Sequence, residues 1–203
     1  MANPIKTALL SVHDKSGLAE IAQHLAQLGV TMYATGGTFR ALHEVQIKAI
    51  PVNELTQSPE MMDGRVKTLH PAVFSGILSR RDSSKDMETL RAHQLDPIDL
   101  VIVNTRPFSQ AAKNSDLSEQ EVLEHIDIGG PAMMRAAAKN WQSVAIVCDP
   151  ADYDDILREM LNNDGALSDA TRRRLALKAF RLTQKLDSEI IAFLEEGRRP
   201  IKE

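Results

Sequence analysis

Two cations, a hydroxyl and an imidazole stand together in the segment Asp63-Gly64-Arg65-Val66-Lys67-Thr68-Leu69-His70-Pro71. The segment has no apolar periodicity, so neither a helix nor a strand accounts for its composition. The charges of Arg65 and Lys67 and the hydroxyl of Thr68 are suited to binding a phosphate. A solvated surface loop would have the same composition, so both readings stay open on this segment alone.

Two further loops, each between an expected strand and an expected helix, combine glycine with hydroxyl or cationic residues. They are Ser11-Val12-His13-Asp14-Lys15-Ser16-Gly17 and Thr35-Gly36-Gly37-Thr38. Glycine lets backbone N–H groups approach an anion, and the dipole of a following helix favours negative charge there. Neither loop is a Walker loop, because the pattern Gly-x-x-x-x-Gly-Lys-Ser/Thr is absent. Each could be an ordinary connector, but two at matching strand ends raise the expectation of a phosphate site.

A fourth segment, Ile126-Asp127-Ile128-Gly129-Gly130-Pro131, precedes a helix expected over residues 132–139. Its carboxylate, Asp127, could recognise an amide or cap the helix. Lys139 stands at the end of that helix, where the dipole favours a lysine even without a functional role. The six histidines show neither His-x-x-x-His spacing nor clustering with cysteine, so no metal site is predicted.

The elements that must position these segments alternate between strands and helices in the first part of the chain. Apolar runs predict strands over 7–12, 30–34, 49–52, 100–104 and 144–147, and helical patterns cover 18–28 and 38–46. This alternation predicts an α/β fold with a mostly parallel open sheet and flanking helices. Ligands of such sheets bind beyond the carboxyl ends of the strands, where the loops above would lie.

From about residue 151 the pattern becomes purely helical, with helices expected over 151–162 and 168–196 and Ser168 as the cap of the second. We therefore expect residues 1–203 to form a single domain. Its α/β core would span about residues 6–150, and a C-terminal helical extension would span about 151–197.

Composition excludes several classes of protein. A net charge of −4 argues against a non-specific nucleic-acid binder, and no apolar run approaches the roughly 20 residues that span a bilayer. The N-terminus lacks the apolar core of a signal peptide, and the single cysteine, Cys148, lies in an apolar run and reads as a buried, inert thiol. We expect a cytoplasmic protein with a small-molecule ligand, no nucleic-acid partner and no membrane contact. The oligomeric state, including a homodimer, is left open.

Taken in order, these segments resemble the inosine-monophosphate cyclohydrolase domain of the bifunctional purine-biosynthesis enzyme that also carries a formyltransferase domain. The resemblance runs from about residue 6 to 195. It rests above all on residues 59–71, which contain the string Asp-Gly-Arg-Val-Lys-Thr-Leu-His-Pro. The loops at 11–17 and 35–38 support it. Three further matching segments are Pro97-Ile98-Asp99-Leu100-Val101, Asp127-Ile128-Gly129-Gly130-Pro131 and Ala138-Lys139-Asn140. It implies a methylglyoxal-synthase-like fold with a helical extension. No formyltransferase domain is contained in these 203 residues.

The implied reaction closes the ring of a formamido-imidazole-carboxamide ribonucleotide with loss of water, without metal or organic cofactor. Such a closure needs stabilisation of the attacking carboxamide nitrogen, a donor to the formyl oxygen and an acid that releases water. By matching position, Lys67 would polarise the formyl oxygen, Lys139 would donate or accept a proton, and Asp127 would be the third catalytic residue. The 5′-phosphate would be held by Lys15, Gly36, Gly37, Thr38 and Thr68, and the base and its carboxamide would be surrounded by Arg65, Lys67, Asn104, Asp127 and Gly129. Ser11, His13, Asp14, Thr35, Thr105, Arg106 and Ile128 complete the expected substrate-binding residues.

Several positions depart from the family pattern. Arg106 replaces the tyrosine of Asn-Leu-Tyr-Pro-Phe, and His13 replaces the serine before Asp-Lys. The other departures are Phe74, Trp141, Leu182 and Leu186. They keep a second hypothesis open, a divergent paralogue that acts on a different phosphorylated or carboxamide-bearing substrate. A ligand-sensing regulatory domain, as the same fold provides in carbamoyl-phosphate synthetase, is a third, and the carboxylate pattern of a methylglyoxal synthase is not evident.

Overall fold

The computed structural model describes residues 4–59, 61–62 and 66–195. Within these residues the centre of the fold is a five-stranded parallel sheet in the order β3-β2-β1-β4-β5. The strands are β1 Thr7–Val12, β2 Thr31–Ala34, β3 Ile50–Pro51, β4 Leu100–Asn104 and β5 Ala145–Val147. Strands β1 and β4 are nearly continuous apolar runs because helices cover both faces of the sheet. The expected α/β class is confirmed.

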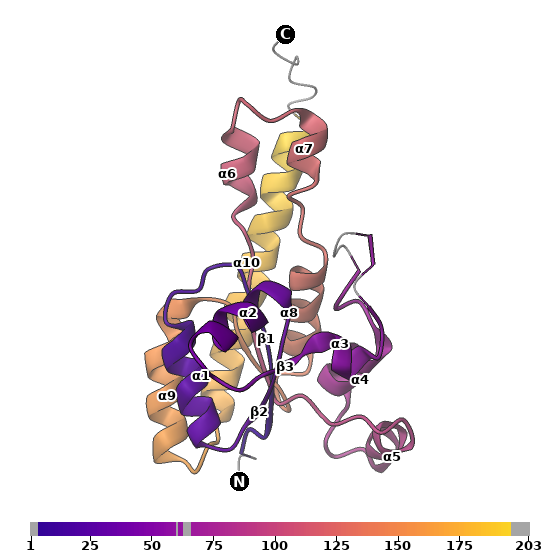
Figure 1. Cartoon of the computed structure of the whole chain (residues 1–203), viewed down its shortest axis with the longest axis vertical. Coiled ribbons are helices and arrows are strands. Elements are labelled where there is room, and N and C mark those ends of the chain that lie inside the picture. The colour runs from indigo at the N-terminus through magenta and orange to yellow at the C-terminus, as the bar shows by residue number, and fades with distance from the viewer. Residues whose placement is uncertain (1–3, 60, 63–65, 196–203) are drawn as a thin grey trace.

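Each face of the sheet has its own apolar cluster. One contains Leu10 and Ile102 with residues from α1 Leu18–Gln27, α2 Gly36–Glu44 and α9 Tyr153–Asn162. The other contains Leu9 and Val101 with residues from α3 Val52–Thr56, α4 Pro71–Leu78, α8 Gly129–Lys139 and α10 Asp169–Glu195. Helix α5 Ser84–Ala92 follows α4 (Figure 1), and the 3₁₀ turn η2 Pro150–Asp152 leads into α9. The helices after residue 151 thus contribute to the same two clusters as the α/β part.

The parallel register brings three loops together at the carboxyl edge of the sheet. Leu10 pairs with Ala34 and Val12 with Asn104, so the loops that follow β2, β1 and β4 begin side by side. The side chain of Asn104 fixes this edge, because its Oδ1 accepts hydrogen bonds from the backbone N–H groups of His13 (2.7 Å) and Asp14 (2.8 Å). Its Nδ2 donates to the Asp14 carbonyl at 3.1 Å.

Some boundaries differ from the sequence prediction. Helix α2 begins at Gly36 and α8 at Gly129, so glycines read as loop residues form the first turns. The first N–H groups of a helix have no partner in the helix, so glycine and proline are tolerated there. Strand β3 is shorter than expected, since Val52 already belongs to α3. The predicted cap is confirmed, because Ser168 Oγ accepts a hydrogen bond from Thr171 N at 3.3 Å.

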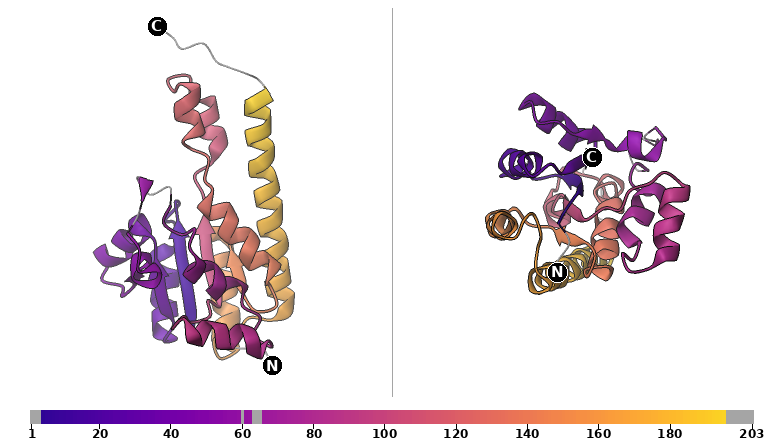
Figure 2. Two further views of the ribbon diagram at one scale, coloured as in Figure 1. Left: turned by 90° about the vertical axis from the view of Figure 1, so that its right-hand side faces the viewer. Right: turned by 90° about the horizontal axis from the view of Figure 1, so that it is seen from below.

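One end of the molecule extends beyond the sheet as an arm, by which we mean α6 Phe108–Lys113, α7 Glu119–Leu123 and residues 186–195 of α10. Figures 1 and 2 show α6 and α7 beside the last turns of α10. A third apolar cluster of Phe108, Val122 and Phe193 joins them, and the rings of Phe108 and Phe193 meet edge to face at 5.6 Å. The arm therefore depends on a small core of its own.

We expect Phe193→Ala to loosen the arm while leaving the sheet intact, because Phe193 is 6% exposed and closes this small cluster. Hydrogen exchange resolved by mass spectrometry should show faster exchange in α6 and α7 and unchanged exchange in β1 and β4. Leu194→Ala is the matched control, since Leu194 is 55% exposed and should leave both unchanged. Unchanged exchange in α6 and α7 of Phe193→Ala would show that this cluster does not hold the arm.

The only cysteine of the chain, Cys148, is buried directly after β5, as its sequence context predicts. Burial raises the pKa of its thiol to about 11, so only about one thiol in a thousand is ionised at pH 8. We expect iodoacetamide to alkylate the native protein at least about 100-fold more slowly than the denatured chain at that pH. Equal rates in the two states, measured by mass spectrometry, would contradict the burial.

In the described part of the chain, no helix combines the length and the apolar character needed to cross a bilayer.

Candidate active site

A pocket of about 930 Å³ lies at the carboxyl edge of the sheet, where the loops after β1, β2 and β4 meet the start of α8. Its volume is in the range that binds a small ligand such as a nucleotide. The sequence-predicted residues that line it are Ser11, His13, Lys15, Thr35, Gly37, Thr38, Lys67, Thr68, Asn104, Thr105, Arg106, Asp127, Ile128 and Gly129. Segments far apart in the sequence therefore share one pocket.

One side of the pocket is formed by the start of α2. The hydroxyl of Thr38 accepts a hydrogen bond from Val12 N at 2.9 Å and donates to Val12 O at 3.2 Å, which ties α2 to β1. Thr35 Oγ1 donates to Ser11 Oγ at 3.0 Å in the same way. These hydroxyls thus hold the backbone in place, and the N–H groups of the first turn of α2 remain the donors for an anion.

Lys15 supplies a cation beside this helix start. Its ammonium group donates to the carbonyl oxygens of Val12 and His13, which draws the side chain back over the end of β1. Burial lowers the pKa of Lys15 and the nearby Arg40 lowers it further, while Asp14 opposes both. The negative charge of a phosphate bound here would favour the protonated form of Lys15.

His13 and Arg106 both line the pocket, in the loops that follow β1 and β4. Desolvation lowers the pKa of His13, and the positive charges of Arg106 and Lys15 lower it further, against the opposing effect of Asp14. Arg106 Nη1 lies 3.1 Å from His125 Nδ1. A guanidinium can only donate, so this contact makes Nδ1 of His125 the acceptor.

The start of α8 forms a further part of the pocket wall. Asp127 Oδ1 accepts a hydrogen bond from Gly130 N at 2.9 Å, which holds the carboxylate over the first turn. A Cβ atom at Gly130 would stand 2.5 Å from Asp127 Oδ2 and 2.8 Å from Thr105 Cγ2, and one at Gly129 would stand 2.7 Å from Thr68 Oγ1. Both glycines therefore allow the close approach of neighbouring side chains.

Lys67 and Thr68 come from the segment that precedes α4. Thr68 is 3% exposed and lies against Gly129, whereas Lys67 is exposed on the pocket wall. Within the described residues, the Lys67 ammonium has neither a hydrogen bond nor an ion pair, so it is available to a ligand. His70 serves the fold, because its Nδ1 accepts from Ala72 N at 3.2 Å and caps α4. Arg65, predicted to contact the base, lies outside the described residues.

The structure does not bring Lys139 to this pocket. Helix α8 runs from Gly129 at the pocket to Lys139, which is about 15 Å further along the helix axis at 1.5 Å per residue. The next residue, Asn140, donates to the carbonyl oxygens of Ile77 and Ser79 at the far end of α4. Direct proton transfer needs a distance of about 3 Å. The role predicted for Lys139 by matching position therefore has no support from this geometry.

Asp14 and Gly36 are also not among the lining residues, although both belong to loops that reach the pocket. Asp14 instead accepts hydrogen bonds from Ser16 N (2.9 Å) and Ser16 Oγ (2.6 Å) at its own Oδ1. Asn104 lines the pocket, but its amide already holds the loop after β1, so its geometry indicates a positioning role.

Sequence reasoning missed lining residues of two kinds: Val12, Ile126, Gly130 and Met133 in or beside recognised segments, and Leu123, Glu124 and His125 at the end of α7 and directly after it. The second group belongs to no recognised motif, and it reaches the pocket only through the fold of the arm. Gly130 and Met133 could have been found from the helix expected after Asp127, because residues three apart in a helix lie on the same face.

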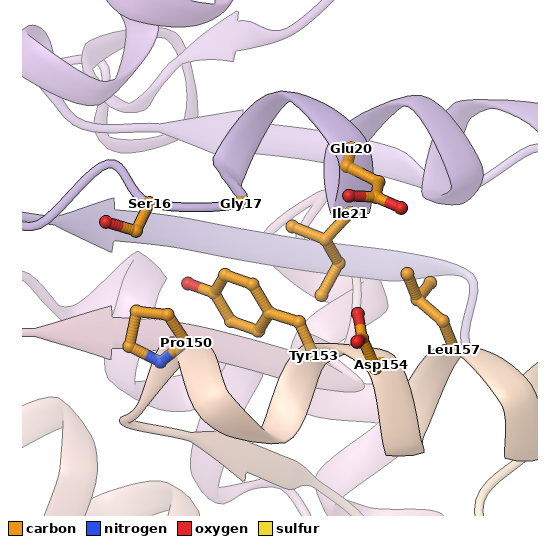
Figure 3. Close-up of a pocket in the computed structure, with 8 residues that line it drawn as sticks. All are labelled: Ser16, Gly17, Glu20, Ile21, Pro150, Tyr153, Asp154 and Leu157. Atoms are coloured by element: carbon orange, nitrogen blue, oxygen red, sulfur yellow. The ribbon is translucent and has the colours of Figure 1, made fainter.

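Two smaller cavities lie near the pocket. One, of about 260 Å³, shares the wall formed by Thr105, Arg106 and residues 125–128 and has an apolar floor that includes Leu186 and Ile190. The other, of about 160 Å³, lies between α1 and α9 (Figure 3), where the ring of Tyr153 lies near Gly17. Burial raises the pKa of Tyr153 to about 12. Among the described residues, no group of three His, Cys, Asp or Glu side chains is placed to hold a metal ion.

Comparison with known proteins agrees with this architecture. The MGS-like domain family matches residues 17–132, and the AICARFT/IMPCHase bienzyme family matches residues 137–203. A solved structure described as "Crystal structure of ForH" superimposes with a TM-score of 0.86 at 34% identity, covering 96% of this chain and 100% of that one.

Curated relatives are considerably longer. The bifunctional purine biosynthesis protein PurH of Listeria monocytogenes serotype 4b (strain F2365) is 47% identical over 190 residues, which are 94% of this chain and 37% of the relative. PurH of Staphylococcus carnosus (strain TM300) is 44% identical over 198 residues, which are 98% of this chain and 40% of the relative. The chain thus spans less than half the length of these relatives. The match over residues 17–132 and the full-length likeness at 34% identity show that the chain belongs to the MGS-like domain family, with a C-terminal part that matches the AICARFT/IMPCHase bienzyme.

Proposed function

We propose that this protein is an inosine-monophosphate cyclohydrolase, which closes the ring of a formamido-imidazole-carboxamide ribonucleotide with release of water. The observation that carries the proposal is the pocket at the carboxyl edge of the sheet. Its lining combines the start of α2 and Lys15 with Lys67 and Asp127. A phosphate site and a polar heterocycle site within one pocket fit a nucleotide precursor. Nucleotide biosynthesis is a cytoplasmic process, which supports the localisation expected from composition.

Lys67 and Asp127 would have different roles in this reaction. The carboxamide nitrogen attacks the formyl carbon, so a C–N bond forms while negative charge develops on the formyl oxygen. The ammonium of Lys67, exposed in the pocket and without a partner in the described residues, is suited to stabilise that charge. Asp127, held by Gly130 N, is suited to accept a hydrogen bond from the carboxamide. The formyl oxygen then leaves as water with two protons that derive from the nitrogens.

A divergent paralogue remains the second candidate, and Arg106 is the observation that favours it. The guanidinium stands in the pocket wall where the family pattern has a tyrosine, so the two would offer a ligand different groups. Such a paralogue would use the same phosphate site and Lys67 on another ribonucleotide.

The direct experiment incubates the purified chain with the formamido ribonucleotide and follows the ultraviolet change that accompanies purine formation. We expect turnover well above the uncatalysed rate without added metal or cofactor. No turnover above background would reject the cyclohydrolase assignment. Binding of the same nucleotide without turnover would instead favour the paralogue.

A further inference from the structure

Helix α10 leaves one of its faces uncovered along most of its length. The large apolar residues on that face are Leu177 (50% exposed), Phe180 (39%), Ile191 (55%) and Leu194 (55%). Another face of the helix packs against α8 and β5. Figure 2 shows α10 along one edge of the molecule, from the sheet to the end of the arm. A single exposed leucine is ordinary on a protein surface, but four large apolar residues on one face of one helix are typical of an interface.

These four residues belong to a regular repeat, which we call the seam. Its six positions, alternately three and four residues apart, are Leu177, Phe180, Gln184, Asp187, Ile191 and Leu194. All six are exposed, so no described element of the chain itself covers the seam. Alternating spacings of three and four are the pattern by which two helices pack along each other in a coiled coil. The missing element is therefore a second helix.

The apolar ends of the seam are complementary to each other when two copies of α10 run antiparallel. A two-fold axis midway along the seam sets Leu177 opposite the partner's Leu194, because these positions are equally far from the axis. The same axis sets Phe180 opposite the partner's Ile191. Each end of the seam thus buries large apolar side chains against large apolar side chains. A patch that matches itself in this way is what a two-fold homodimer requires.

The polar centre of the seam favours the antiparallel orientation. Gln184 would lie opposite the partner's Asp187, where its amide can donate to the carboxylate. Arg181, about one turn before Gln184 on the exposed face, could reach the same carboxylate. Asp187 lines the 260 Å³ cavity with Arg106 and Arg135, yet in the described part of the chain neither Asp187 nor Arg181 forms an ion pair. A parallel pair would instead oppose Asp187 and the partner's Asp187, whose charges repel.

From this register we propose that the seam is a homodimer interface, in which α10 of one copy packs antiparallel on α10 of a second copy. The seam spans about 26 Å of helix axis at 1.5 Å per residue. A contact between two helices of this length buries less than the roughly 800 Å² per partner of a standard interface. The dimer therefore exchanges with the monomer, with a Kd of about 10 µM.

Sedimentation equilibrium of the purified chain tests the association. Between about 1 and 200 µM, the average mass should rise from near 22.5 kDa towards twice that value. Ile191→Glu should stay monomeric throughout, because it would bury a charge against the partner's Phe180. Ala192→Glu is the matched control, since it adds the same charge on the same helix outside the seam and should associate like the wild type. A wild-type mass that stays at 22.5 kDa, or unchanged association of Ile191→Glu, would overturn the proposal. Both substituted positions are exposed, so the fold should be kept, and circular dichroism checks this.

Disulfide cross-linking tests the orientation. Leu177→Cys and Leu194→Cys are purified separately, and the native Cys148 is buried and should not compete. In an antiparallel dimer each new thiol lies about 26 Å from its own symmetry mate, far beyond the reach of a disulfide. Mild oxidation of the mixed variants should therefore give cross-linked dimers, joined between positions 177 and 194 in peptide mass spectra. Each variant alone should give less than about a tenth of that yield. Cross-linking within single variants, without enrichment in the mixture, would indicate parallel helices and contradict the register.

Discussion

Replacing Lys67 with alanine is expected to lower kcat for ring closure by about 100-fold or more, with a much smaller change in nucleotide affinity. The loss is typical of removing one donor that stabilises charge developing in the transition state. Affinity should be kept because the phosphate site at α2 and Lys15 lies in other segments of the pocket. Steady-state rates, with Kd for the product nucleotide from titration, separate the two effects.

Lys113→Ala is a suitable control for loss of a surface charge, because Lys113 lies in α6 and does not line the pocket. It should retain wild-type kcat. A Lys67→Ala variant with wild-type kcat would show that Lys67 does not polarise the formyl oxygen. A variant that lost only affinity would assign Lys67 to binding.

Gly130→Ala is expected to reduce both kcat and stability, because the start of α8 leaves no space for a side chain. The new Cβ would stand 2.5 Å from Asp127 Oδ2 and 2.8 Å from Thr105 Cγ2, and both distances are shorter than van der Waals contact. Asp127 must then move from its position over Gly130 N. We expect at least a tenfold loss in kcat and a loss of about 1–3 kcal/mol in the free energy of unfolding.

Gly37→Ala is the matched control for stability. It makes the same change in the first turn of α2, where the nearest atom to the new Cβ is Arg40 Nη2 at 4.0 Å. Its free energy of unfolding, measured by urea denaturation, should equal or slightly exceed that of the wild type. Equal free energies of unfolding for Gly130→Ala and Gly37→Ala would mean that the side chains around Gly130 move aside without destabilising the protein.

The positions of the strands were predictable because their signal is local. The apolar runs at 7–12 and 100–104 can be buried on both faces only in the middle of a parallel sheet, and they form β1 and β4. The loops that follow must then meet at one edge, which is why Ser11, Thr35 and Asn104 line one pocket. The glycine-bearing helix starts were misread by a few residues, because a glycine gives the same signal in a loop and in a first helical turn.

Other parts of the candidate site depend on tertiary structure that no motif records. Lys139 belongs to a matched motif, yet the length of α8 separates it from Gly129 by about 15 Å. His125 has no motif and reaches the pocket because the Phe108–Phe193 contact fixes the arm. The side chain of Asn104 was expected at the base, whereas its hydrogen bonds hold the loop after β1.

The measurement that tests the location of the chemistry most directly compares ring closure by Lys67→Ala and Lys139→Ala under identical conditions. Lys67 lies on the pocket wall, whereas Lys139 lies at the end of α8 that is far from the pocket. We predict that Lys139→Ala keeps a kcat within about threefold of wild type while Lys67→Ala loses about 100-fold or more. A loss in Lys139→Ala as large as that in Lys67→Ala, in a folded protein, would contradict catalysis by the pocket as described.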